Sequence, residues 1–383
     1  MAPLFILGLQ RSGTTLLYEI FAASGAFNIS TAWHVICFDE LRRGVDDPAA
    51  SRQRLQERFA AAGLTPRGMD IVKIGPDTPE EYGFVLAGRG LGMRITRRSL
   101  PVFEEFCEVV RRYPAAGGKG FPVAEVREGI HAGARFPSRT TEMQDSHPAV
   151  CGKGFPLAEV REGILAPAAL APAAPPADRP LVLKNTWDFG NAARIKALVP
   201  GARFVFIHRN PVQIVSSLYR VVRKAVLKGF PYLELLSDRF RRFAAGGVPL
   251  RLARLLCARM PGLLARGVVH FVAHQARGHL RGLSVLNTTD YIDVRYEDLC
   301  AHPNETMARL LAFAGVDPGA AGGPPVDYRP MIGPHATHVE AEIIDRRRLV
   351  VRRLARYATA IGYDLSTLGE GVGASPRKEL PGR

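Results

Sequence analysis

Short apolar runs alternate along the chain with longer stretches in which apolar residues recur every three or four positions. The runs cover residues 3–8, 180–184, 203–208 and 290–295, and their continuity is typical of strands that are buried on both faces. Helical spacing covers 14–24, 51–62, 99–113, 191–199, 211–228, 264–282, 303–314 and 340–361. This alternation predicts an α/β fold, a three-layer sandwich with a central parallel sheet flanked by helices.

One α/β domain over residues 1–365 is the simplest organisation of this pattern. Residues 114–179 depart from it, and we interpret them as a loop insertion. Within the insertion, GGKGFPVAEVREGI (117–130) recurs almost unchanged as CGKGFPLAEVREGI (151–164), which indicates a tandem duplication, and a Pro/Ala-rich linker follows. Residues 366–383 lack an apolar period and are expected to form a disordered tail.

The chain carries a formal net charge of +15, and only 8 of its 51 basic residues are lysine. Such an excess suits an anionic ligand or surface. A solvated surface with a compositional bias towards arginine explains it as well. Aromatic residues are not interleaved with the basic ones, so no nucleic-acid partner is expected.

The chain has five widely spaced cysteines and no CxxC pair. This pattern disfavours a disulfide framework and favours a reducing compartment. No leader precedes the glycine at position 8, and we expect a cytoplasmic protein without a transmembrane segment. Residues 248–272 come closest to a span, but arginines interrupt them. We interpret that stretch as a buried amphipathic helix pair broken at Pro261-Gly262, with a peripheral membrane contact as the alternative.

The first apolar run leads into a loop with the layout of a phosphate-binding loop. In LFILGLQRSGTTLL (4–17) a strand ends at Gly8, the loop reaches Gly13, and a helix begins at Thr14. The triphosphate-binding motif G-x-x-x-x-G-K-[ST] has lysine where this chain has Thr14. Because the lysine is missing and no predicted strand ends in Asp, a metal-dependent triphosphate site is disfavoured.

The same loop nevertheless has the groups that an oxyanion needs. We expect the backbone N–H groups from Ser12 to Leu16 to face one cavity at the helix start. The hydroxyls of Thr14 and Thr15 add donors, and Arg11 supplies a planar cation. A turn without a ligand is the alternative for this stretch taken alone.

A second strand–loop–helix unit follows later in the chain. In FVFIHRNPVQIVSSLYR (204–220), Arg209 stands at the carboxyl end of a buried strand, where open α/β sheets bind ligands. Pro211 is suited to begin the next helix, and Ser217 follows within it. An arginine and a hydroxyl here would suit a second phosphate.

Together the two units resemble the sulfotransferase superfamily, which uses 3′-phosphoadenosine 5′-phosphosulfate (PAPS). QRSGTTLL (10–17) is similar to its 5′-phosphosulfate loop, in the arginine form of the tyrosylprotein and bacterial branch, and HRNPVQIVSS (208–217) is similar to its 3′-phosphate element. LVLKNTWDFGNAARIKALVPGARFVFIHRNP and YIDVRYEDLCAHPNETMARLLAFAGV also follow the family pattern, in the right order. The resemblance implies a P-loop-like sandwich.

Carried over onto this sequence, the resemblance also implies site residues. The 5′-phosphosulfate would be bound by Arg11, Ser12, Gly13, Thr14 and Thr15, and the 3′-phosphate by Arg209 and Ser217. Lys184 matches a lysine that neutralises charge near the bridging oxygen, although an exposed lysine after a strand is the alternative. No metal is implied, because Arg11, the loop amides and Lys184 supply the positive charge.

The base that takes the acceptor's proton is not fixed by the resemblance. The tyrosylprotein branch has a Glu about twenty residues after the loop arginine, whereas this sequence reads ISTAWHVICFDELRR there. His34 is the first candidate, because its unperturbed pKa is near neutral. Asp39, Glu40 or a residue elsewhere are the alternatives.

The leading hypothesis is a sulfotransferase that moves a sulfuryl group from PAPS to a hydroxyl or amine, with PAP as the other product. A small metabolite or a lipid is the expected acceptor. The rivals are a P-loop kinase or triphosphatase and a non-enzymatic nucleotide-binding module. The oligomeric state is not readable from the sequence.

Overall fold

The structure is a computed structural model that describes residues 2–64, 74–115, 179–316, 326–333 and 338–365. The predicted duplication and the predicted tail lie outside these residues, and both stay predictions.

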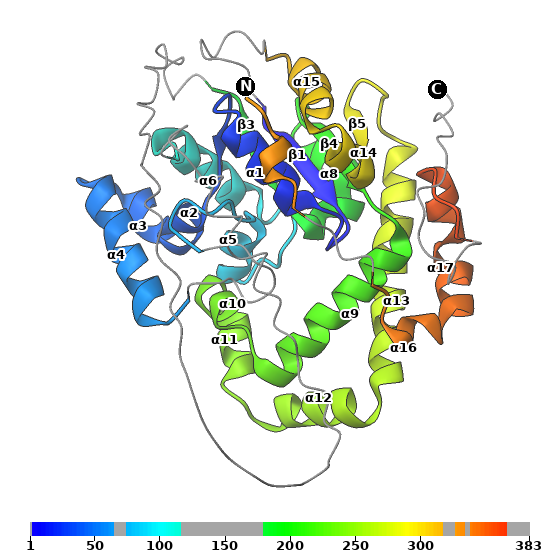
Figure 1. The fold of residues 1–383 in the computed structure, drawn as a ribbon. Helices are drawn as coiled ribbons and strands as arrows, with labels where there is room; N and C mark the ends of the chain where they lie inside the picture. The colour runs from blue at the N-terminus through cyan, green and yellow to red at the C-terminus, as the bar shows by residue number, and fades with distance from the viewer. Residues whose placement is uncertain (1, 65–73, 116–178, 317–325, 334–337, 366–383) are drawn as a thin grey trace, which may run out of the picture.

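A parallel sheet forms the centre of the described chain (Figure 1). Its order is β2-β3-β1-β4-β5, with β1 Leu4–Gly8, β2 Asn28–Ile29, β3 Leu181–Lys184, β4 Arg203–His208 and β5 Tyr291–Arg295. Every pairing is parallel, and β1 is bonded to both β3 and β4. The predicted α/β class and the four predicted strands are therefore confirmed.

The strand that the apolar pattern missed, β2, is an edge strand of two residues. The backbone N–H of Asn28 donates to the carbonyl of Pro180 at 2.9 Å, and its side-chain amide donates to the carbonyl of Arg179 at 3.3 Å. A strand of this length is too short to show a hydrophobic period.

Side chains of β1 alternate between two apolar cores. Leu4 and Ile6 belong to one core, and Phe5 and Leu7 belong to the other, as the two-residue period of a strand requires. Phe5 stacks on Phe204 of β4 with ring centroids 5.8 Å apart. All five residues of β1 are buried, because the strand lies between two neighbours and under helices on both faces.

Helices cover both faces of the sheet. The Leu4–Ile6 face packs on α1 (Thr14–Ala23), α14 (Tyr296–Ala301) and α15 (Pro303–Ala314), with the turn η3 (Arg329–Met331) beside them. The core on the other face draws on α2 (Ala32–Ile36), α3 (Phe38–Arg43), α4 (Pro48–Ala61), α5 (Gly83–Gly88), α6 (Leu100–Arg112), η2 (Thr186–Asn191), α8 (Ala192–Leu198), α9 (Pro211–Lys228), α10 (Pro231–Leu236), α13 (Pro261–Leu283), α16 (Ala341–Ile344) and α17 (Arg347–Ala360). Farther from the sheet lie α11 (Asp238–Ala244) and α12 (Val248–Arg259), near the lower end of the molecule in Figure 1.

Several helix predictions needed correction. The stretch 340–361 is two helices, α16 and α17, and the stretch 191–199 is preceded by the 3₁₀ segment η2. The sequence did not predict the helices α2, α3, α5, α10, α11 and α14. They have five to seven residues each and are therefore too short for a clear helical period.

The predicted break at Pro261-Gly262 is present, since α12 and α13 meet there at 105°. The prediction that this pair is buried is wrong for α12, of which only Leu250 and Cys257 are buried. No single helix in the described ranges is long and apolar enough to cross a membrane.

Candidate active site

The loop after β1 turns back on itself through two residues with left-handed backbone angles. Arg11 has φ 74° and Gly13 has φ 101°, and among the described residues Arg11 is the one non-glycine with a positive φ. This conformation costs a side chain on the order of 1–2 kcal/mol and is found mostly where function requires it. The predicted run of amides is shorter by one, because the N–H of Ser12 donates to the carbonyl of Leu9 at 3.0 Å.

Gly13 is required by its neighbour as well as by its φ. A Cβ at Gly13 would overlap the ring of Tyr296, the first residue of α14. The same ring lies under the guanidinium of Arg209, 4.3 Å from its carbon to the ring centroid. Tyr296 therefore touches both predicted anion-binding elements, a position that the sequence did not reveal because it depends on β5 lying beside β4.

The two elements are also joined directly. Arg11 Nε donates to Ser217 Oγ at 3.1 Å, across 206 residues of sequence. Arg209 Nε donates to Gln213 one turn into α9, at 3.0 Å. The structure thus brings the loop arginine and the α9 hydroxyl together at the carboxyl edge of β1 and β4.

Polar atoms remain unpaired in the loop. The hydroxyl of Ser12 and both side-chain polar atoms of Gln10 are buried and have no hydrogen-bond partner among the described residues. The first N–H groups of α1 also have no carbonyl partner within the helix. Because unpaired buried polar groups are costly, this loop is suited to a ligand that supplies acceptors. The residues present fit an oxyanion such as a phosphate or phosphosulfate.

Lys184, at the end of β3, lies beside the same helix start. Its side chain is 1% exposed, which rules out the alternative of a solvated lysine. Its ammonium donates to Thr15 Oγ1 at 3.2 Å and lies 3.6 Å from Glu81 Oε1. One cation therefore links the anion loop to a carboxylate.

That carboxylate, Glu81, is the functional candidate that the sequence analysis missed. It is 8% exposed and also accepts from the hydroxyl of Thr186 at 3.3 Å. Its backbone N–H donates to Glu80 Oε1 at 2.9 Å. Glu80 itself is fully buried and accepts a hydrogen bond from the hydroxyl of Tyr232. This contact fixes the backbone next to Glu81, whose side chain reaches Lys184.

A buried carboxylate fixes the surroundings of Glu81 and Lys184. Asp188 accepts from the hydroxyl of Tyr82 at 2.7 Å, from the amide of Asn185 at 2.9 Å and from the amide of Asn191 at 2.7 Å. Burial raises the pKa of Asp188 to about 6, and these hydrogen bonds oppose the shift. The residues directly after Glu81 and after Lys184 are thus tied to one carboxylate.

His34 is not placed as a base. It is fully buried, Nδ1 lies 2.8 Å from Thr31 Oγ1 and accepts from the Thr31 N–H at 3.1 Å, and Nε2 lies 2.7 Å from the carbonyl of Tyr113. It completes the capping box of α2. Burial lowers the pKa of His34 to about 4. With both nitrogens engaged inside the protein, the structure does not support the first candidate for the base.

The two alternatives also lie elsewhere. Asp39 is largely exposed and pairs with Arg89, and Glu40 pairs with Arg54 at 2.7 Å. Both belong to the outer helix α3. Neither contact involves the anion loop, so Glu81 is the carboxylate that the structure brings to it.

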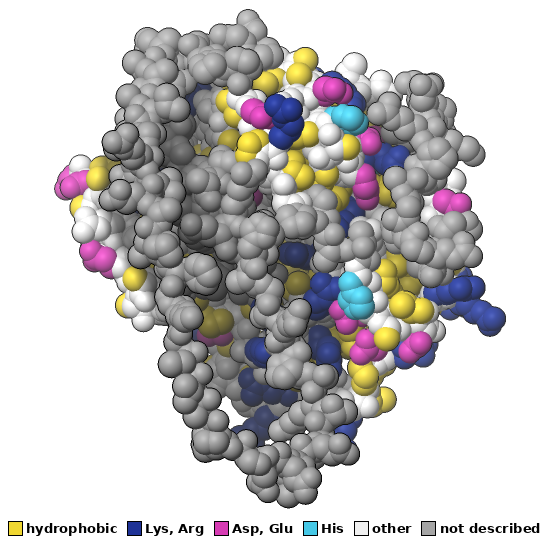
Figure 2. Space-filling view, viewed as in Figure 1, with side chains coloured by type: hydrophobic (Ala, Val, Ile, Leu, Met, Phe, Trp, Pro, Cys, Tyr) yellow, Lys and Arg dark blue, Asp and Glu magenta, His cyan; other side chains and the backbone are white. Residues whose placement is uncertain are grey.

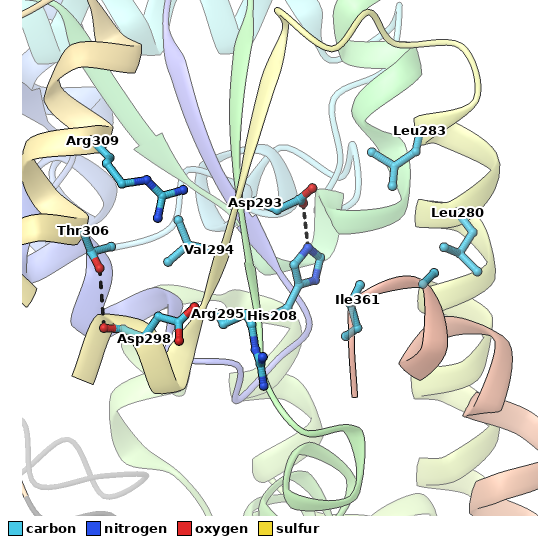
Figure 3. Close-up of a pocket in the computed structure, with 11 residues that line it drawn as sticks. His208, Leu280, Leu283, Asp293, Val294, Arg295, Asp298, Thr306, Arg309 and Ile361 are labelled. Carbon is cyan, nitrogen blue, oxygen red and sulfur yellow. Dashed lines mark hydrogen bonds and ion pairs between the residues drawn. The ribbon is translucent and has the colours of Figure 1, made fainter. Parts of the chain in front are cut away.

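A cavity of about 190 Å³ lies across the edge strand β5, apart from the loop (Figure 3). His208 forms part of its wall, 2.8 Å from Asp293 and 3.0 Å from the hydroxyl of Tyr357. These contacts fix the carboxyl end of β4, directly before Arg209. The described residues contain no group of three or more His, Cys, Asp or Glu that could hold a metal ion.

The parallel sheet, the anion loop after β1 and the basic element after β4 define a P-loop-like α/β protein. The chain belongs to the sulfotransferase family, whose sequence model matches residues 3–318. The resemblance seen in the sequence motifs is thereby confirmed.

The fold agrees with one solved sulfotransferase structure. The sulfotransferase STF9 from Mycobacterium avium aligns with a TM-score of 0.56 at 12% identity, over 95% of this chain and 78% of that one. STF1 from Mycobacterium tuberculosis H37Rv gives 0.49 at 14% identity, over 93% and 76%. No curated protein sequence matches the chain.

Proposed function

We propose that the protein transfers a sulfuryl group from PAPS to an acceptor hydroxyl or amine. The observation that carries the proposal is the buried Lys184, which joins the start of α1 at Thr15 to the carboxylate of Glu81. A phosphate-binding loop, a cation and a carboxylate in contact are the groups that in-line sulfuryl transfer needs.

The donor would be held at its two ends by separate elements. The loop amides, Arg11 and the hydroxyls of Ser12, Thr14 and Thr15 suit the 5′-phosphosulfate. Arg209 and Ser217 suit the 3′-phosphate, and the hydrogen bond from Arg11 to Ser217 fixes the two elements relative to each other.

When bound, PAPS supplies an activated sulfuryl group and leaves as PAP. Lys184 provides positive charge where the departing phosphate gains negative charge. Glu81 is suited by its position to take the proton of the acceptor hydroxyl, because Lys184 joins its carboxylate to the start of α1, where the sulfuryl group would lie. We assign the base to Glu81 in place of His34. None of these roles requires a metal ion.

The acceptor is proposed to be a small metabolite or a lipid. A cytoplasmic location is proposed with it, and the free cysteines among the described residues, at positions 37, 107, 257 and 300, support a reducing compartment.

Nucleotide binding separates this function from its main rival. We expect PAP to raise the unfolding temperature and Mg-ATP to leave it unchanged, because the loop has no lysine at position 14. Stabilisation by Mg-ATP alone would instead indicate a triphosphate-using enzyme.

Catalysis needs a separate test. The protein is incubated with PAPS and a native extract, and mass spectrometry seeks products heavier by one sulfuryl group. Such products should be absent with the Arg11→Ala variant, which removes the guanidinium of the loop without leaving the buried pair of Glu81 and Lys184 uncompensated. If PAP binds but no acceptor is sulfated by the wild type, the chain is a nucleotide-binding module.

A further inference from the structure

Residues 239–289 have an unusual charge pattern. The segment contains nine arginines and no lysine, aspartate or glutamate. Eight of these arginines are exposed, and six of the eight lie on α11, α12 and the first turns of α13: Arg241, Arg242, Arg251, Arg254, Arg259 and Arg266. Figure 2 shows basic side chains gathered in the lower half of the visible face, below the sheet. Part of the chain's excess of positive charge is therefore concentrated in this one segment.

Exposed apolar side chains lie among these arginines. Six of the ten exposed large hydrophobic residues in the described chain fall between 243 and 263, namely Phe243, Val248, Leu252, Leu255, Met260 and Leu263. Scattered exposed hydrophobic residues need no explanation, but a cluster of this kind marks a contact surface. We call these six residues and those six arginines the apolar–arginine platform.

The helix α12 shows how the platform is built. Leu250 and Cys257 are seven residues apart and form its buried face. Val248, Leu252 and Leu255, spaced by four and three residues, form the opposite face and are 76%, 52% and 53% exposed. A helix that packs on a core needs an apolar face only on the side of the core. The helix α12 has a second apolar face, which is exposed.

We propose that the apolar–arginine platform docks on the surface of an anionic lipid bilayer. Apolar side chains with flanking arginines are the composition of helices that lie in the membrane interface. The arginines attract anionic head groups, and the apolar face enters the acyl boundary. A second copy of the chain fits less well, because it would bring six arginines against six, and the acidic residue of α11, Asp238, already pairs with Arg241 at 2.5 Å.

The platform lies at the same end of the molecule as the candidate active site. In Figure 1, α9 descends from the carboxyl end of β4, and α12 crosses below it. Arg254 of α12 donates to the carbonyl of Val226 in α9 at 3.1 Å. Val226 lies nine residues beyond Ser217, about 14 Å along the helix axis at 1.5 Å per residue. If the proposed sulfuryl transfer holds, docking would present a lipid-borne acceptor to it.

Vesicle sedimentation tests the docking without using any enzymatic activity. The full chain is mixed with vesicles of equal parts phosphatidylcholine and phosphatidylglycerol, or of phosphatidylcholine alone. We expect binding to the anionic vesicles that falls at high salt, and at least about tenfold weaker binding to the neutral ones.

Two matched variants locate the contact. Leu252→Ser with Leu255→Ser should weaken binding to the anionic vesicles about tenfold or more. Val285→Ser with Ile344→Ser, which alters exposed hydrophobic residues elsewhere, should leave it unchanged. Stabilisation by PAP, measured on each variant, shows that it is folded and reports on the proposed function separately.

Two results would overturn the docking proposal. One is a wild-type chain that does not bind anionic vesicles, or a Leu252→Ser and Leu255→Ser variant that binds them as well as the wild type does. The other is a dimer in light scattering that the Leu252→Ser and Leu255→Ser changes dissociate, which would make the platform a contact between copies.

Discussion

Glu81 and Lys184 hold opposite charges 3.6 Å apart, in a place that little water reaches. Removing either charge outright leaves the other buried without compensation, which typically costs about 3–5 kcal/mol. A test of catalysis at this pair therefore needs a variant that keeps the size and hydrogen bonding of the side chain.

Glu81→Gln is such a variant. Because an amide cannot accept the acceptor's proton, we expect kcat to fall by about 10²–10⁴-fold while the Kd for PAP changes little. Steady-state kinetics and calorimetric titration with PAP measure the two effects. Glu105→Gln, at a half-exposed carboxylate on α6, is the control. Full turnover by Glu81→Gln would remove the base assignment.

The lowered pKa of His34 leads to a prediction about the pH dependence of the free energy of unfolding. Its pKa is about 4 when folded and near 6.5 when unfolded, so between these values the unfolded chain binds a proton that the folded chain does not. Acidification therefore favours unfolding, and from pH 7 to pH 4 it should cost the wild type about 3 kcal/mol relative to His34→Gln.

The comparison with His34→Gln is necessary because Asp188 acts in the opposite direction. Its raised pKa of about 6 means that the folded chain gains a proton first as the pH falls, which favours folding. Gln at position 34 can keep the capping box. Denaturant unfolding at several pH values gives the difference, and parallel curves for the two proteins would contradict the prediction.

At the scale of elements, the junction of β1 and α1 depends on Gly13. Gly13→Ala adds strain at φ 101° and an overlap with Tyr296, and we expect PAP binding to weaken at least about tenfold. Gly25→Ala is the matched control, because Gly25 has φ 65° but open space around it. Equal PAP affinities for the two variants would show that Tyr296 does not constrain the loop.

Local patterns predicted the elements that carry the candidate anion site. The loop glycines, Arg11 and Ser217 were found because each belongs to an apolar strand followed by a helix, and both signals lie within about twenty residues. Glu81 could not be found in this way. Its proposed role rests on its contact with Lys184, 103 residues later, and no spacing in the sequence records that contact.

His34 shows the converse error. Its residue type and its distance from Arg11 suited a base, but the chain turns at Thr31 so that the ring caps α2. Burial of the ring depends on α6 and Tyr113, which a local pattern does not reveal.

At the scale of the whole molecule, the predicted insertion can be tested by removing it. The described ends of the segment are anchored near β2, through Tyr113 on one side and Arg179 on the other. If residues 114–179 are an insertion, a flexible Gly/Ser linker in place of 116–178 should leave the unfolding temperature within a few degrees and PAP binding intact.

Thermal unfolding with and without PAP is the measurement. A shortened chain that fails to fold would show that the segment is part of the domain.

The single helix α9 has a consequence for which acceptors could be reached. It carries Ser217 in its second turn and supports α12 near its C-terminal end, without a break between them. An unbroken helix holds Ser217 and Val226 about 14 Å apart along its axis, and this distance does not change with the acceptor. If the platform docks on a bilayer as proposed, an acceptor whose hydroxyl projects from the head group would be favoured over one whose hydroxyl lies among the acyl chains.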